Sequence, residues 1–196
     1  MNGKQNHQQI LVEFYLPAEQ VDGYVSISAR LRLLDLLNRA GAADSEAYSE
    51  YIEVSPMSTE IEDDVSKKQY VKKSTIELAA VLNPESARGF GGKCKTYPFV
   101  EKQKTLIRVN TVHYSLRGTT FYPCEGNLLA LLDEGATFLP LVNVTLTGMD
   151  GKNHVRPFVA VGKAWISSVE ECCDGEGMGS SPAMQRTSIE VVPVAK

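Results

Sequence analysis

The residues that could act as general acids, bases or nucleophiles are few and widely spaced. His113 lies beside Tyr114 in a β-branched run, and His154 precedes Arg156 near an expected turn. Neither histidine has a cysteine or serine at a spacing typical of a catalytic pair, and the motifs GxSxG, HExxH and GxGxxG do not occur. We therefore expect a protein that is not an enzyme and has no catalytic residues.

The string RGFGGKCKT (88–96) resembles two nucleotide-binding motifs but lacks residues that each requires. A P-loop needs a glycine where Ala87 stands and a serine or threonine where Cys94 stands. An RNA-recognition strand that opens with R-G-F-G needs an aromatic residue where Gly92 stands. We expect neither motif to function here.

The spacing of the cysteines is not typical of a zinc site. The four cysteines are Cys94, Cys124, Cys172 and Cys173. The only close pair is adjacent in sequence, and such a pair forms a disulfide only through a strained ring. The opening MNGKQNHQQ does not resemble a secretory signal, so an oxidising compartment is not expected. We expect reduced thiols, no metal and no cofactor, with a redox role for Cys172 and Cys173 as the alternative.

Composition and charge favour a cytoplasmic protein without membrane insertion. The chain has 196 residues and a formal net charge of −4, which is ordinary for a globular protein. It contains no run of about 18 apolar residues, the length that a membrane-spanning helix needs. The weak acidic excess is not typical of proteins that coat nucleic acids, because these neutralise phosphates with basic surfaces.

Two halves of the chain have the same order of expected elements. In the first half we expect two strands within 8–28, a leucine-rich helix at 30–40, and strands at 51–57 and 74–82. In the second half we expect two strands within 105–123, a helix at 127–133, and strands at 138–146 and 157–170. The pairs Gly23 and Gly118, Leu33 and Leu128, and Leu37 and Leu132 are each 95 positions apart. This shared spacing predicts that one β-β-α-β-β unit occurs twice.

The expected fold class is mainly β (α+β), with two tandem β-β-α-β-β units that form small barrel-like or sandwich domains and pack together. A unit of about 75 residues buries little apolar surface by itself, so the two units are expected to cover each other. The predicted boundaries are 8–82 for the first repeat, 83–104 for a linker, 105–171 for the second repeat and 172–196 for a flexible tail.

The two short helices are expected to be structural. They are too short to be stable alone, so their leucines are expected to be buried in the core. Asp35 is spaced to pair with Arg30 or Arg32, and Asn38 is placed to cap the helix end.

Three segments carry a family resemblance: RLLDLLN (32–38), FLPLVNVTL (138–146) and FVAVGKAWISSV (158–169). They resemble an uncharacterised bacterial family, domain of unknown function 6812. The first half keeps the family's R-L-x-D-x-L-N helix, and the second half keeps the F-L-P-L strand from Phe138 and the mid-strand lysine, Lys163. Each half departs from the motif that the other keeps, which indicates that the halves have specialised. The resemblance implies a small cytoplasmic bacterial domain in two copies and implies no catalytic residues.

An acidic segment and a β-prone tail favour a regulatory or scaffold module that binds another protein. Residues 43–66 carry eight acidic residues and no lysine or arginine, and lysines follow, which predicts a long hairpin with an acidic tip. The apolar end 189–194 is expected either to pair with an edge strand of its own protein or to add a strand to a partner. The predicted protein-binding residues are Glu60, Glu62, Asp63, Asp64, Ile189, Val191 and Val192.

Nucleic-acid binding by a small Sm-like barrel is the main alternative. The linker carries basic residues with interleaved aromatic residues, a composition that binds single strands by charge and stacking. Its predicted contacts are Arg88, Lys93, Lys95, Tyr97 and Phe99. A small-ligand sensor with a pocket between the two domains is a third possibility. The sequence leaves the oligomeric state open, because edge strands permit self-association.

Overall fold

The computed structural model describes residues 7–28, 31–38, 49–57, 68–83, 101–172 and 188–190. The first half contains β1 (His7–Tyr15), β2 (Gln20–Ser28), α1 (Leu33–Asn38), β3 (Tyr51–Val54), β4 (Gln69–Lys72), the 3₁₀ turn η2 (Lys73–Thr75) and β5 (Leu78–Val81). The second half contains β6 (Lys102–Thr111), β7 (Tyr114–Pro123), α3 (Leu128–Asp133), β8 (Phe138–Gly148), β9 (Asn153–Gly162), the 3₁₀ turn η4 (Lys163–Trp165), β10 (Ile166–Glu171) and β11 (Ser188–Glu190). The expected mainly β fold class is confirmed.

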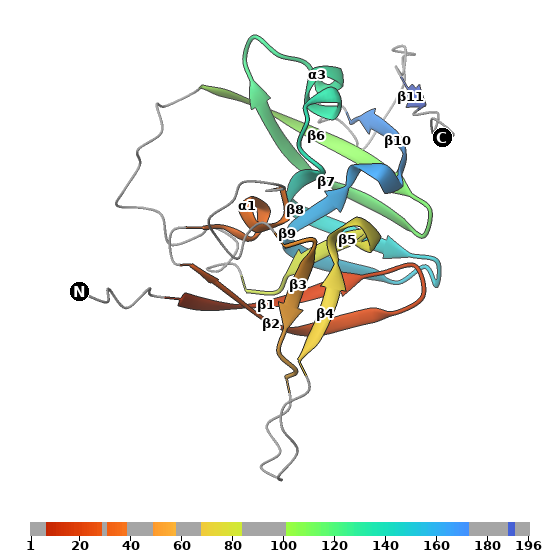
Figure 1. The fold of residues 1–196 in the computed structure, drawn as a ribbon. Helices are drawn as coiled ribbons and strands as arrows, with labels where there is room; N and C mark the ends of the chain where they lie inside the picture. The colour runs from red at the N-terminus through yellow and green to blue at the C-terminus, as the bar shows by residue number, and fades with distance from the viewer. Residues whose placement is uncertain are drawn as a thin grey trace, which may run out of the picture.

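Nine strands form one sheet, in the order β11-β10-β6-β7-β8-β9-β5-β1-β2, and β3 and β4 form a separate two-stranded sheet (Figure 1). In the first half β1 pairs with β2 and β5, and in the second half β6 pairs with β7 and β10. A bridge between Tyr24 and Ser55 links β2 to β3, where the second half has a full ladder between β7 and β8. Because β5 also pairs with β9, one sheet runs through both halves.

Two boundaries differ from the sequence-based ones. Strand β6 begins at Lys102, so the last residues of the expected linker 83–104 belong to the sheet. A 3₁₀ turn, which was not expected, precedes the last strand of each half. In the second half it divides the single strand expected at 157–170 into the end of β9 and β10. Residues 84–100 of the linker lie outside the described residues.

Strands β5 and β9 form a wall with a hydrophobic core on each side. Leu78 and Ala80 of β5 face a core built mostly from the second half, whereas Ala79 and Val81 face a core built mostly from the first half. The β9 residues paired with them divide between the two cores in the same way. All four β5 residues are fully buried, which explains why this strand is apolar throughout instead of alternating. Each core is therefore closed by strands from both halves.

The leucines of the two helices are buried to different extents. In α1, Leu33, Leu36 and Leu37 are buried in the first core, as expected. In α3, only Leu128 is buried, and Leu129 is exposed to 47%. The expectation of buried leucines is thus confirmed for α1 and only in part for α3.

Lys163 of η4 closes the C-terminal end of α3. Its Nζ donates hydrogen bonds of 2.6, 3.0 and 2.9 Å to the carbonyl oxygens of Leu131, Leu132 and Glu134. These carbonyls have no partner within such a short helix, and a cation at this end also interacts favourably with the helix dipole. Lys163 therefore has a structural role, and burial lowers its pKa.

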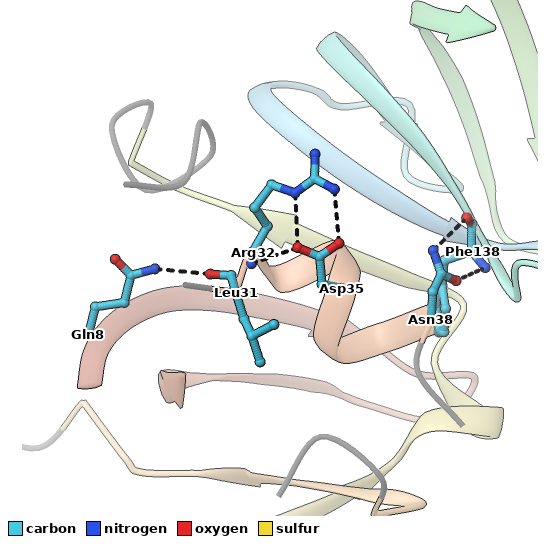
Figure 2. A network of polar contacts seen from close by, with 6 residues as sticks. All are labelled: Gln8, Leu31, Arg32, Asp35, Asn38 and Phe138. Carbon is cyan, nitrogen blue, oxygen red and sulfur yellow. Dashed lines mark hydrogen bonds and ion pairs between the residues drawn. The ribbon is translucent and has the colours of Figure 1, made fainter. Parts of the chain in front are cut away.

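Figure 2 shows the polar contacts around α1, among them the contact from its C-terminal end to β8 of the second half. Arg32 is the partner of Asp35, since its guanidinium donates two hydrogen bonds of 2.9 and 3.0 Å to that carboxylate. The side chain of Asn38, which was expected to cap the helix, instead bonds to the backbone of Phe138. Its Oδ1 accepts from the Phe138 N–H at 2.7 Å, and its Nδ2 donates to the Phe138 carbonyl at 3.4 Å. Asn38 thus ties the helix of the first half to β8 of the second.

We predict that Gly23→Ala destabilises the fold, because a Cβ on this β2 residue would overlap the Ser55 carbonyl oxygen and the Val54 side chain. The free energy of unfolding should fall by about 1–3 kcal/mol, the usual cost of overpacking. As a control, Gly135→Ala places a Cβ where no atom lies within 4 Å, and it should change stability by less than about 0.5 kcal/mol. Urea unfolding followed by circular dichroism measures both, and equal effects would contradict the close approach of β3.

Candidate functional site

The structure places only part of the predicted protein-binding set. Residues 188–190 form β11, which lies antiparallel to β10, so this part of the tail pairs with the protein's own sheet. Strands β3 and β4 pair as the arms of the expected hairpin. The side chains of all seven predicted protein-binding residues lie outside the described part of the chain: Glu60, Glu62, Asp63, Asp64, Ile189, Val191 and Val192.

The nucleic-acid contacts predicted in the linker also cannot be placed. Arg88, Lys93, Lys95, Tyr97 and Phe99 all lie outside the described residues. Only the basic residues that continue into β6, such as Lys102 and Lys104, are described, and both are exposed. The exposed residues that the structure places, and that could form a binding site, lie on the strands.

Three tyrosines form an exposed surface on the strands of the first half. Tyr24 of β2, Tyr51 of β3 and Tyr70 of β4 expose 37%, 47% and 61% of their surface. Paired residues share a face and side chains alternate along a strand, so the three tyrosines project from the same side of β2, β3 and β4. We call this surface the tyrosine face. Sequence reasoning missed it, because the face depends on the register between three strands.

The tyrosine face carries charged groups between its aromatic rings. Glu53 of β3 accepts a hydrogen bond of 3.3 Å from the Tyr70 hydroxyl and lies 2.7 Å from Lys68 Nζ. The hydrogen bond from Lys68 holds the pKa of the Glu53 carboxyl below its usual value. These groups are exposed, so the ion pair stabilises the fold little and stays accessible to a binding partner.

A second surface is a polar hollow of about 550 Å³ on the sheet of the second half. All residues that line it are polar or charged, and they come from β6, β7, β8, β9 and β10. Asn110, Ser115 and Ser168 are joined beneath it by hydrogen bonds of 2.8 and 2.9 Å. This network orders the floor of the hollow and uses up much of its hydrogen-bonding capacity.

Two arginines in the hollow lie directly opposite each other on adjacent strands. Arg108 of β6 pairs in register with Arg117 of β7. Like charges in this position destabilise a sheet unless an anion offsets them. Arg108 has Glu170 at 3.9 Å, whereas the side chain of Arg117 has no hydrogen bond or ion pair within the described part of the chain. The hollow can therefore accept an anionic group at Arg117.

Glu77, immediately before β5, is fully buried and connects the two halves. Its carboxylate accepts hydrogen bonds from the Thr111 hydroxyl and from the backbone N–H of His113, the latter at 3.0 Å. It also lies 2.7 Å from His113 Nδ1. Thr111 is the last residue of β6 and His113 lies in the turn before β7, so both partners belong to the second half. Thr111 and His113 both bond to the carboxylate instead of to each other, so the imidazole does not activate the hydroxyl. The arrangement positions the turn.

A second buried carboxylate makes a similar connection. Arg156 of β9 donates hydrogen bonds of 2.7 and 3.0 Å to the two oxygens of Glu13 on β1. The Tyr15 hydroxyl donates to Glu13 at 2.8 Å, and burial together with this bond raises the Tyr15 pKa above its ordinary value. A paired two-pronged contact of this kind fixes the relative position of two strands.

No group of three or more His, Cys, Asp or Glu side chains among the described residues is placed to hold a metal ion. Cys124 and Cys172 are free thiols, and the other two cysteines lie outside the described ranges. No helix in the described part of the chain is long and apolar enough to cross a bilayer.

No protein-family model matches this chain, and comparisons with curated proteins and with solved structures likewise gave no match. The resemblance of residues 32–38, 138–146 and 158–169 to domain of unknown function 6812 therefore stays a prediction.

We predict that Glu77→Leu strongly destabilises the fold, because an apolar side chain leaves the Thr111 hydroxyl and the His113 N–H without their acceptor. The free energy of unfolding should fall by roughly 2–4 kcal/mol, since donors left without an acceptor lose the hydrogen bond and are not fully resolvated. Glu19→Leu makes the same change at an exposed position and serves as the control. Thermal or urea unfolding measures the difference, and a Glu77→Leu variant as stable as the control would show that the cluster does not hold the halves together.

Proposed function

We propose that the chain is a non-enzymatic, cytoplasmic regulatory or scaffold module that binds another protein through the tyrosine face. The observation that carries the proposal is the exposure of Tyr24, Tyr51 and Tyr70 on one side of three neighbouring strands. Tyrosine is enriched at protein interfaces, because it buries a large rigid ring at little entropic cost while its hydroxyl keeps a polar partner. The acidic residues predicted at the hairpin tip follow β3 directly, so a partner with an apolar groove and basic flanks fits this end of the molecule.

We also propose that the chain contains two copies of one unit, as the 95-residue spacing predicts. The support is the recurrence of the strand pairings in both halves and the matching position of two lysines. Lys73 and Lys163 each open a 3₁₀ turn before the last strand of their half, and burial lowers the pKa of both.

We predict that the double variant Tyr24→Ser/Tyr51→Ser loses its protein partner. Removing two central aromatic contacts typically costs at least about 2 kcal/mol of binding energy, or roughly 30-fold in affinity. Met149→Ser/Val155→Ser removes two other exposed apolar side chains, which are 82% and 74% exposed on the β8–β9 hairpin, and is the matched control.

The measurement is quantitative mass spectrometry of proteins cross-linked in cells to each tagged variant. At least one protein should be captured by the native chain and the control variant and depleted at least tenfold with the tyrosine variant. If every captured protein is retained by the tyrosine variant, the tyrosine face is not the binding surface.

Nucleic-acid binding is a second candidate function, and the opposed Arg108 and Arg117 favour it. Two guanidinium groups on adjacent strands, one without an ion-pair partner among the described residues, suit the phosphates of a nucleic-acid backbone. Thr145 and Asn153 also line the hollow, and their hydroxyl and amide N–H groups can contact a sugar or a base. This surface differs from the linker contacts that the sequence predicts, which lie outside the described residues.

We predict, for this second function, that Arg108→Gln/Arg117→Gln weakens binding of single-stranded RNA at low salt. Loss of two phosphate contacts should also reduce the slope of log affinity against log salt by about 1.4, since each contact contributes about 0.7. Lys102→Gln/Lys152→Gln removes the same charge outside the hollow and is the control. Fluorescence polarisation measures both, and no binding at low salt, or equal losses in the two variants, would eliminate nucleic-acid binding at the hollow.

A further inference from the structure

The junction between the two halves joins the last strand of one half to a hairpin of the other. Strand β5 pairs with β1 on one side and with β9, the outer strand of the β8–β9 hairpin, on the other. The corresponding strand of the second half is β10, which pairs with β6. The hairpin corresponding to β8–β9 is β3–β4, and the outer edge of β4 has no strand partner among the described residues. The junction therefore leaves two edges unused: the outer edge of β10 and the outer edge of β4.

The edge of β10 is covered by the C-terminal strand β11. Ile76 and Ile166 are both buried and lie 90 positions apart, as do Lys73 and Lys163, so Val169 of β10 corresponds to Ala79 of β5. In the junction Ala79 lies opposite Ala160 of β9, and Val169 lies opposite residue 189 of β11. Strand β11 thus occupies on β10 the place that β9 occupies on β5.

From this correspondence we infer that β10 is a docking edge for β4 of a second copy of this chain, and that β11 is a removable strand that occupies the edge in the single chain. The contact would repeat the β5–β9 junction between molecules. The contact joins β10 of one copy to β4 of the next, so the two ends of the assembly always keep one free β10 edge and one free β4 edge. The assembly is therefore an open head-to-tail chain. Figure 1 shows the β3–β4 hairpin at the lower end of the molecule and β10 with β11 at the upper right.

The charges on the two edges are complementary. When the register of β5 and β9 is transferred to β10 and β4, Glu171 lies opposite Lys68, because Val81 lies opposite Phe158 in the junction. Both side chains are exposed in the single chain, and an opposite-charge pair across two strands stabilises their pairing. In the same register Tyr70 lies opposite Val169, beside the core of the second half. Docking would therefore cover Tyr70, the most exposed of the three tyrosines on the tyrosine face.

The polarity of β10 indicates that this association is weaker than the junction. Leu78 and Ala80 of β5 are buried against the core of the other half, whereas the corresponding residues of β10 are Ser168 and Glu170. Less apolar surface is buried by β10, so its pairing with β4 is reversible. A strand as short as β11 can then compete with a second molecule for the same edge.

Sedimentation velocity of the full chain and of a chain ending at residue 187 tests the inference. Removal of β11 should strengthen self-association at least about tenfold, the gain expected when a competing strand occupies the edge in nine molecules of ten. The shortened chain should form a concentration-dependent series of dimers, trimers and larger species. Ile189→Pro in the full chain should have the same effect, because proline cannot donate to a strand ladder, and circular dichroism verifies that each variant is folded.

Charge reversal identifies the edges that meet. In the shortened chain, Lys68→Glu and Glu171→Lys should each abolish the series, and the combined variant should restore it. A shortened chain that stays monomeric at millimolar concentration, stops at dimers, or associates regardless of charge reversal would overturn the inference. Equal association of the full and shortened chains would overturn the role of β11. These outcomes are independent of the proposed protein partner, because sedimentation is measured on this chain alone. The two tests also change different residues, since Tyr24→Ser/Tyr51→Ser leaves Lys68, Tyr70 and Glu171 unchanged.

Discussion

The two-stranded wall of β5 and β9 is the constraint on which the rest of the structure depends. Where Leu78–Val81 of β5 pair with Phe158–Val161 of β9, the side chains point alternately into two hydrophobic cores, so neither face of this paired segment meets water. A half of this size has too little apolar surface to form a stable core alone, and the wall solves this by contributing side chains to the cores of both halves. The small residues Ala79 and Ala80 suit a strand with a core on each side, because larger side chains would push the two cores apart.

Polar contacts around the wall fix how the halves are placed. Glu77, the Glu13–Arg156 pair and Asn38 each connect a residue of the first half to the second. Hydrophobic burial by itself tolerates small shifts between strands, whereas a buried carboxylate that loses its donors is costly. These contacts therefore fix the relative position of the strands of the two halves, which hydrophobic burial alone does not determine. The outer surfaces are then free to carry the tyrosine face and the polar hollow.

The sequence contained much of the fold but little of the candidate site. Leucines at helical spacing placed α1 and α3, and the β-type runs within 8–28 and 105–123 placed the β1–β2 and β6–β7 pairs. These signals are local, and local signals can be read from neighbouring residues. The pairing of β5 with β9 is not local, and four consecutive apolar residues do not reveal which strand lies beside them.

The surfaces could not be predicted for a related reason. The tyrosine face combines residues separated by up to 46 positions, from Tyr24 to Tyr70, and becomes a surface only when β2, β3 and β4 are in register. Arg108 and Arg117 are closer in sequence, but their opposition depends on the exact length of the β6–β7 turn. Prediction from composition favoured the acidic segment 43–66 and the basic linker 83–104 instead, because runs of charge are visible without knowledge of strand register.

The central claim is that the shared wall makes the two halves one cooperative unit. Native-state hydrogen exchange across a denaturant series tests it most directly, because it resolves the opening of separate parts of a fold. We predict that the slowest amides of β1, β5, β6 and β9 exchange with a single free energy, equal to that of global unfolding. Amides of β6 and β7 that remain protected where those of β1 and β5 have already exchanged would contradict a shared core.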